Sequence, residues 1–169
     1  MKQTRYLILA AIFAVLTALG TWIRIPMPVS SFTLQTFFCA MAGLLLGSRW
    51  GAVSQLVYLL LGLVGLPVFT TGGGFSAFLT PTGGFLLGLI PMAWIGGKVK
   101  NSFPACLLGL LALYAVGLPW MHTVITVYLQ RPWSLWQTIL YGMVLFLPWD
   151  ILKMALAAWL CKKIRPRLL

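Results

Sequence analysis

Six apolar stretches, separated by short polar or glycine-rich segments, constrain this chain more than any other feature. They run over Leu7–Ile23, Thr33–Gly47, Gly51–Val68, Gly83–Gly97, Phe103–Leu129 and Leu135–Cys161. A helix needs about 20 apolar residues to cross a bilayer, and the second and fourth stretches are shorter than that. Of the 169 residues, 61% are hydrophobic and 8% are charged, which is more apolar than a water-soluble domain. The sequence therefore predicts an all-α integral membrane protein, a single domain over residues 1–169 with six transmembrane helices.

The basic residues predict how the helices are oriented. Arg24 and Arg131 lie in one alternate set of connections. The other set, with the two chain ends, carries Lys2, Arg5, Arg49, Lys98, Lys100, Lys162, Lys163, Arg165 and Arg167. Cytoplasmic loops carry the excess of basic residues, so both termini should be cytoplasmic, in agreement with an even number of crossings. Because more spans follow, we interpret the first stretch as a membrane helix and not as a cleaved signal peptide.

A net charge of +11 in a soluble protein would suggest a nucleic-acid partner. Here the basic residues are spread between apolar segments and form no patch. The charge pattern instead indicates a lipid bilayer as the surroundings and no nucleic acid as a partner.

The only acidic residue, Asp150, lies inside the last apolar stretch, three residues before Lys153. It precedes Lys162 by twelve residues, or ~18 Å of helix, which places it near the middle of a ~30 Å hydrocarbon core. A charge at that depth costs roughly 2.5–3.5 kcal/mol on insertion scales. Asp150 and Lys153 share a helix face and can form a pair that is structurally inert, or the two can bind a polar ligand. We favour a ligand, since a pair that only neutralises itself still carries a desolvation cost.

A glycine-rich segment separates the third and fourth stretches. Gly72, Gly73 and Gly74 in a row cannot form a stable helix, and Pro81 interrupts one. Irregular backbone at membrane depth is tolerated where it is buried or lines a cavity. The segment is therefore either a loop that lets backbone groups approach a small molecule or a turn at the outer surface.

Three further features have two interpretations each. Gln35, near the start of the second stretch, could contact a ligand or hydrogen-bond another helix. Trp149, beside Asp150, could stack on a flat ligand or pack in the core. A stripe of small residues permits close approach of a helix from this chain or from a partner. The stripe consists of Ala10, Ala14 and Ala18, with Ala11 beside it.

The inventory of reactive groups argues against an enzyme. With one carboxylate, one histidine and no cysteine cluster, the chain lacks a second group for general acid–base catalysis and lacks a ligand set for a metal. A membrane-embedded enzyme that uses Asp150 as a base is therefore disfavoured. We expect no metal and no cofactor, and if ATP drives the function, another protein hydrolyses it.

Several runs, taken in order, resemble the BioY family, the biotin-specific substrate-binding (S) components of energy-coupling factor (ECF) transporters. The resemblance covers nearly the whole chain, and its combination of motifs is specific. The runs are Phe32–Thr36, Ala42–Gly47, Gly62–Phe69, Pro81–Phe85 and Phe146–Lys153.

This resemblance implies a six-helix protein of a prokaryotic cell membrane that binds biotin from outside. In the family the Asp and Lys of the D-x-x-K run contact the ligand and the glycine loop closes over it, which points to Asp150, Lys153 and Gly72–Gly74. A transmembrane coupling subunit and two cytoplasmic ATPases are the implied partners. S components dock through an alanine motif on the first helix, either Ala14 with Ala18 or the phase that begins at Ala11.

The chain departs from the family pattern at two places. Trp149 stands where the family usually has glycine, and Leu86 stands where some members have arginine. With fewer polar contacts available, Asp150 and Lys153 become more important for a ligand. An S component for another small vitamin and a structural membrane subunit with an inert Asp–Lys pair remain the alternatives.

Overall fold

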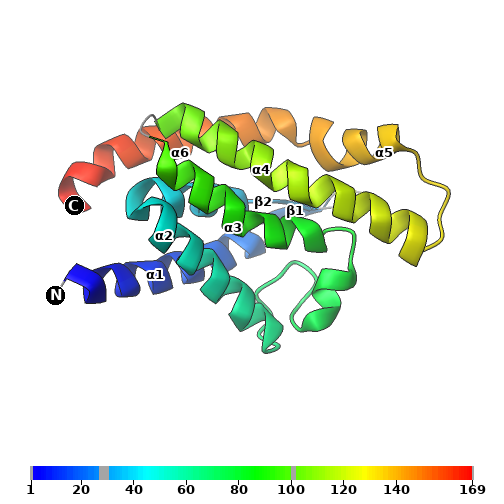
Figure 1. The fold of residues 1–169 in the computed structure, drawn as a ribbon, viewed down its shortest axis with the longest axis horizontal. Coiled ribbons are helices and arrows are strands. Elements are labelled where there is room, and N and C mark those ends of the chain that lie inside the picture. Colours follow the sequence, from blue (N-terminus) through cyan, green and yellow to red (C-terminus); the bar gives the residue numbers. More distant parts are fainter. Residues whose placement is uncertain (1, 27–30, 100–101, 169) are drawn as a thin grey trace.

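The computed structural model describes residues 2–26, 31–99 and 102–168, most of them helical (Figure 1). The α-helices are α1 (Lys2–Trp22), α2 (Gln35–Leu63), α3 (Gly83–Lys98), α4 (Ser102–Thr123), α5 (Leu135–Ile139) and α6 (Leu147–Leu168). Shorter elements are the strands β1 (Arg24–Pro26) and β2 (Ser31–Thr33), the 3-10 helix η1 (Phe75–Leu79) and the π-helical turns η2 (Val124–Tyr128) and η3 (Leu140–Val144). The all-helical class predicted from the apolar stretches is confirmed.

Helix α2 contains both the second and the third apolar stretch. Gly47 interrupts it with φ 80° and ψ 177°, a conformation that side-chain-bearing residues rarely adopt. The two halves then pack closely, since a Cβ on Gly51 would lie only 2.8 Å from the Cα of Gly43. The helix ends at Leu63, five residues before the predicted Val68.

The helices lie side by side in a bundle. Helix α2 packs against α1, α3 and α6, and α4 packs against α3 and α6. Helix α1 starts and α6 finishes at the same end of the molecule, where α3 also ends and α4 begins (Figure 1). The turn at Gly47 packs against Gly97, near the end of α3. The connections before α3 and before α5 lie away from that end.

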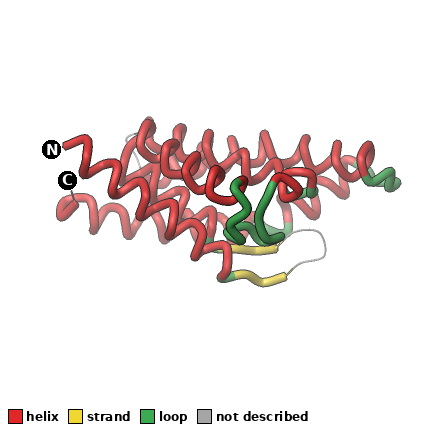
Figure 2. Tube along the Cα trace, turned by 90° about the horizontal axis from the view of Figure 1, so that it is seen from below, coloured by secondary structure: helices red, strands yellow, loops and turns green. Residues whose placement is uncertain are grey.

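A short β-hairpin, which the apolar pattern did not predict, joins α1 to α2. Strands β1 and β2 are antiparallel, with Ile25 opposite Phe32. Thr33 therefore belongs to β2, and α2 begins at Gln35 instead of the predicted Thr33. The hairpin lies on one side of the helices, next to the connection between α2 and α3 (Figure 2). Trp22 Nε1 donates to Pro67 O at 3.2 Å, which ties the end of α1 to that connection.

Among residues 2–26, 31–99 and 102–168, four helical segments are long and apolar enough to cross a membrane by length and composition: Gln3–Trp22, Gln35–Leu63, Ser102–Tyr128 and Leu135–Pro166. The last two contain the π-helical turns, so the fifth and sixth stretches are helical over most of their predicted lengths, with a turn at Leu145 and Phe146. Six crossings and cytoplasmic termini remain predictions. Lys100, one residue of the charge count, lies outside the described residues, as do the side chains of Lys2 and Arg167.

Candidate ligand site

The candidate site is a pocket among α2, α3, α4 and α6, bordered by the hairpin. Its empty space, counted out into the solvent at its open mouth, is about 660 Å³. Threonines, aromatic rings and leucines line most of it, and one carboxylate and one ammonium face it. The lining residues are Ser31, Phe32, Thr33, Gln35, Thr36, Thr70, Thr82, Phe85, Leu86, Leu89, Leu113, Tyr114, Gly142, Phe146, Asp150 and Lys153.

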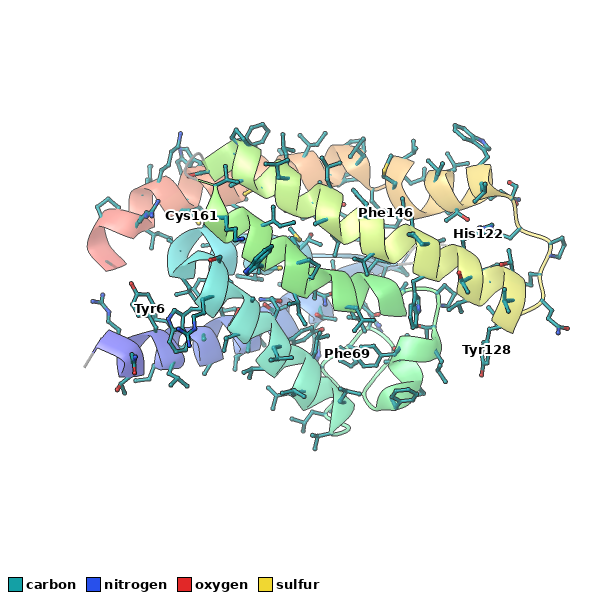
Figure 3. The ribbon with its side chains drawn as sticks, viewed as in Figure 1. Tyr6, Phe69, His122, Tyr128, Phe146 and Cys161 are labelled. Atoms are coloured by element: carbon teal, nitrogen blue, oxygen red, sulfur yellow. The ribbon has the colours of Figure 1, made fainter. Side chains whose placement is uncertain are left out.

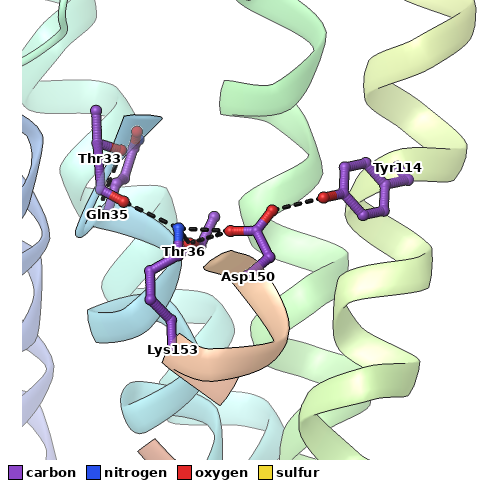
Figure 4. A network of polar contacts seen from close by, with 6 residues as sticks. All are labelled: Thr33, Gln35, Thr36, Tyr114, Asp150 and Lys153. Carbon is purple, nitrogen blue, oxygen red and sulfur yellow. Dashed lines mark hydrogen bonds and ion pairs between the residues drawn. The ribbon is translucent and has the colours of Figure 1, made fainter. Parts of the chain in front are cut away.

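Asp150 lies in the first turn of α6 and is 4% exposed. Its Oδ1 lies 2.5 Å from Lys153 Nζ, and its Oδ2 accepts a hydrogen bond of 2.5 Å from the Tyr114 hydroxyl on α4 (Figure 4). The Thr36 hydroxyl lies 3.5 Å from Oδ1, at the limit for a hydrogen bond. The carboxylate is thus paired and solvated by protein groups, as a buried charge must be.

Lys153 is 7% exposed, and protein groups occupy all three of its donors. Besides the ion pair, Nζ donates to Thr33 O at 3.0 Å and to Thr36 Oγ1 at 2.7 Å (Figure 4). The ammonium also lies 4.3 Å from the centroid of the Phe32 ring, which adds a cation–π contact. Strand β2 and the start of α2 therefore hold the lysine against the aspartate.

Asp150 and Lys153 differ in how many hydrogen-bond positions they have left for a ligand. A carboxylate has about four acceptor positions, and the pair and the two hydroxyls use three of those on Asp150. One acceptor position stays available to an N–H donor. The saturated Lys153 can bind a ligand oxygen only by releasing one of its present partners. The arrangement suits a ligand with an N–H group beside an oxygen acceptor.

Gln35 lines the pocket and links it to the rest of the fold. Its Nε2 donates to the Tyr58 hydroxyl at 3.1 Å, and Tyr58 in turn donates to Val68 O at 3.0 Å. Tyr58 also lies 3.1 Å from the hydroxyl of Thr21 on α1. Gln35 thus makes a hydrogen bond between the two halves of α2, which were predicted as separate helices, while its side chain still borders the pocket.

The three consecutive glycines are not among the residues that line the pocket. Gly72 pairs with Phe69 through two backbone hydrogen bonds, and Gly74 N donates to Gly62 O at 2.7 Å. A Cβ on Gly73 would lie 2.3 Å from Leu66 O, so only glycine fits there. In this structure the glycines fold the connection onto itself and onto α2. Two threonines of the same connection, Thr70 and Thr82, face the pocket instead.

Trp149 also lies outside the pocket lining and is 54% exposed. It touches the site only through Phe32, whose ring meets the indole edge to face at 6.0 Å. Trp149 therefore neither packs in the core nor stacks over the pocket. It packs against the Phe32 ring, which in turn contacts the Lys153 ammonium.

The alanine stripe splits between two environments. Ala10 and Ala14 are buried in this chain at 1% and 0% exposure, and α1 packs on α2. Ala18 is half-buried, whereas Ala11 is exposed. Of the two helix faces considered for a partner, the one that contains Ala11 is open, and Ile8, Ile12, Val15 and Leu19 extend it with exposed apolar side chains.

Sequence reasoning missed Tyr114, Thr36 and Phe32 as members of the site. Thr36 stands in the quoted Phe32–Thr36 run, so that motif was a usable signal. Tyr114 is 36 residues from Asp150 in an otherwise apolar helix, and no local pattern marks it. Its role follows only from the packing of α4 against α6.

Known proteins resemble this chain over nearly its whole length. A family model described as the BioY family matches residues 1–169. A probable biotin transporter BioY of Lysinibacillus sphaericus is 42% identical over 152 residues, covering 85% of this chain and 78% of that protein. The biotin transporter BioY of Thermotoga maritima is 36% identical, covering 95% of this chain and 96% of that protein. The crystal structure of the S-component for biotin from an ECF-type ABC transporter is similar at a TM-score of 0.82 and 26% identity, covering 98% of this chain and 93% of that one.

Proposed function

Since this chain belongs to the BioY family, we propose that it is the substrate-binding subunit of a biotin uptake transporter. It is a multi-pass membrane protein and a transporter component, not an enzyme. The observation that carries the proposal is the pocket, in which a buried carboxylate and ammonium sit side by side among apolar walls. Biotin has a ureido group with two N–H donors and one carbonyl oxygen, an apolar fused ring and a carboxylate.

The hydrogen-bond inventory of the pair suggests how the ligand enters. A ureido N–H can take the remaining acceptor position of Asp150 without displacing a protein group. An oxygen of biotin, from the ureido carbonyl or the carboxylate, can reach Lys153 only in exchange for Thr33 O, Thr36 Oγ1 or Asp150 Oδ1. The longest of these three contacts is the one to Thr33 O, at 3.0 Å. Exchange of that carbonyl is therefore the smallest change that lets a ligand oxygen reach Lys153.

The segment between α2 and α3 is proposed to close over bound biotin. Thr70 and Thr82 from this segment border the pocket, and Tyr58 connects it to Gln35 on the pocket wall. Ligand binding should therefore order residues 64–82 and protect them from protease. Equal cleavage of this segment with and without biotin would contradict this part of the proposal.

The protein is proposed to cross the plasma membrane of a prokaryote six times, with both termini in the cytoplasm. The start of α1, the end of α3, the start of α4 and the end of α6 lie at one end of the bundle, as such a topology requires (Figure 1). The turn at Gly47 packs against Gly97, near that end of α3. The basic residues Arg5, Arg49, Lys98 and Lys162 belong to that end, whereas Arg24 belongs to the hairpin. This distribution supports placing that end in the cytoplasm.

An ECF coupling subunit and two cytoplasmic ATPases are the proposed partners, because this chain has no group that could hydrolyse a nucleotide. The open face of α1 around Ala11 is the proposed contact for the coupling subunit. Its exposed side chains are apolar, and a helix within a membrane can pack closely where a small residue stands. Ala14 is unsuitable for the same role because it is already buried against this chain.

Titration of radiolabelled biotin onto the purified, detergent-solubilised protein tests the proposal. Saturable binding that unlabelled biotin displaces, and that thiamine and riboflavin do not displace, is the expected result. Absence of saturable biotin binding by a protein that unfolds cooperatively would refute it. If another vitamin displaces the label more strongly than biotin does, that vitamin is the substrate, and the protein is still the substrate-binding subunit of a vitamin transporter.

A further inference from the structure

A second hollow lies between the first turn of α4 and the last turns of α6. It shares no residue with the ligand pocket, and its empty space, counted out into the solvent at its open side, is about 1100 Å³. Figure 3 places Cys161, in its wall, toward the end where α6 finishes and away from His122 and Tyr128. Its lining residues are Leu44, Ser102, Phe103, Pro104, Cys161, Lys162, Arg165 and Pro166.

Two cations face this groove without a counter-charge. Lys162 and Arg165 are exposed and stand three residues apart on α6, so they share a face and repel each other. Within the described part of the chain, neither has a hydrogen bond, ion pair or ring contact. By contrast, Lys163 lies 4.1 Å from the Trp159 ring and Lys98 lies 3.5 Å from the Trp94 ring.

No acidic side chain of this protein supplies the missing counter-charge. The one that exists, Asp150, is twelve residues before Lys162, or ~18 Å along α6, and is already bound to Lys153. The groove therefore presents two cations that a bound anion can neutralise.

The setting of the groove identifies the kind of anion. Trp159 lies near the end of α6, beside Lys162, and Trp94 lies near the end of α3, beside Lys98. Tryptophan is enriched at the level of the lipid headgroups. The walls opposite the charges are apolar, formed by Leu44, Phe103 and Pro104. A wall of this kind accommodates an acyl chain, whereas a free ion would gain nothing from it. The first turn of α4, which borders the groove, adds the positive end of its helix dipole.

We propose that this groove is a binding site for an anionic phospholipid, with the headgroup phosphate between Lys162 and Arg165 and an acyl chain along the apolar wall. The site is separate from the ligand pocket, so the proposal does not depend on the identity of the transported ligand. Basic grooves between membrane helices on the cytoplasmic side are suited to such headgroups.

Native mass spectrometry of the full-length protein in detergent tests this proposal, with titration of phosphatidylglycerol and, separately, of phosphatidylcholine with the same acyl chains. The wild-type protein should retain phosphatidylglycerol preferentially. At ~1 kcal/mol per basic residue near an anionic surface, each of Lys162→Gln and Arg165→Gln should lower that preference about fivefold, and the double variant about thirtyfold. Arg165→Lys should keep most of it.

Lys163→Gln is the matched control, because it removes a neighbouring positive charge that lies over Trp159 and outside the groove. The proposal predicts that this variant binds phosphatidylglycerol like the wild type. It is overturned if Lys163→Gln weakens binding as much as the double variant does, or if the wild type binds both lipids equally. Displacement of the lipid by inorganic phosphate would likewise overturn the assignment to a phospholipid. Biotin binding should be unchanged in every variant.

Discussion

Replacing both members of the buried pair distinguishes a ligand-binding role from a purely structural one. The variants are Asp150→Asn, Lys153→Met and the double replacement Asp150→Leu/Lys153→Met. The first two leave one unpaired charge in the pocket. The double variant leaves none and replaces the pair by apolar side chains.

The single variants should be strongly destabilised. Removal of one partner of a buried ion pair costs about 3–5 kcal/mol, because the other charge stays buried and uncompensated. In Asp150→Asn, the ammonium keeps Thr33 O, Thr36 Oγ1 and the Phe32 ring, so the loss should fall at the lower end of this range. In Lys153→Met, the carboxylate keeps Tyr114 and the distant Thr36 hydroxyl, so the loss should be larger.

The double variant should regain most of this stability, since an apolar replacement of a whole buried pair is often neutral or stabilising by about 1–4 kcal/mol. Biotin binding should not recover. A hydrogen bond to a charged group contributes about 1.5–3 kcal/mol, so each single variant should bind about 10- to 150-fold more weakly. The double variant loses contacts to both charges and should show no measurable binding.

Two measurements on the same detergent-solubilised samples test this, namely thermal unfolding and equilibrium binding of radiolabelled biotin. Recovered stability together with absent binding supports the ligand-binding role. If the double variant binds biotin like the wild type, the pair does not contact the ligand and the reasoning fails. If the double variant stays as unstable as the single variants, the pair serves the fold, as expected of a structural subunit.

Three further predictions follow from single contacts. Tyr114→Phe removes the hydroxyl that donates to Asp150 Oδ2, so stability should fall by about 1.5–3 kcal/mol and biotin binding should weaken, while the exposed control Tyr128→Phe should change neither. Gly51→Ala should cost about 1–3 kcal/mol in thermal unfolding, because its Cβ would lie 2.8 Å from the facing backbone of α2. Gly96→Ala, with its nearest neighbour at 3.6 Å, should instead stabilise helix α3 by roughly 0.5–1 kcal/mol. Ala11→Trp should abolish co-purification with an ECF coupling subunit and leave biotin binding intact, and normal co-purification would exclude this face as the contact.

Features that depend on a single helix were predictable from the sequence. A single apolar segment at membrane depth forms a helix whatever surrounds it, because only a helix makes all its backbone hydrogen bonds within one segment. The pairing of Asp150 with Lys153 follows in the same way, since three residues on a helix bring two side chains to one face. The end of the second apolar stretch at Gly47 is also where the structure interrupts α2.

Contacts between distant segments were decided by the tertiary structure. Tyr114 reaches Asp150 because α4 packs on α6, and Thr33 reaches Lys153 because an unpredicted hairpin places β2 beside that helix. The glycines Gly72–Gly74 fold back onto α2 instead of lining the pocket. Helical periodicity specifies which residues of one helix share a face, but it carries no information about which other segment that face meets. The charged pair was therefore visible in the sequence, whereas the groups that surround it emerged only when the helices packed together.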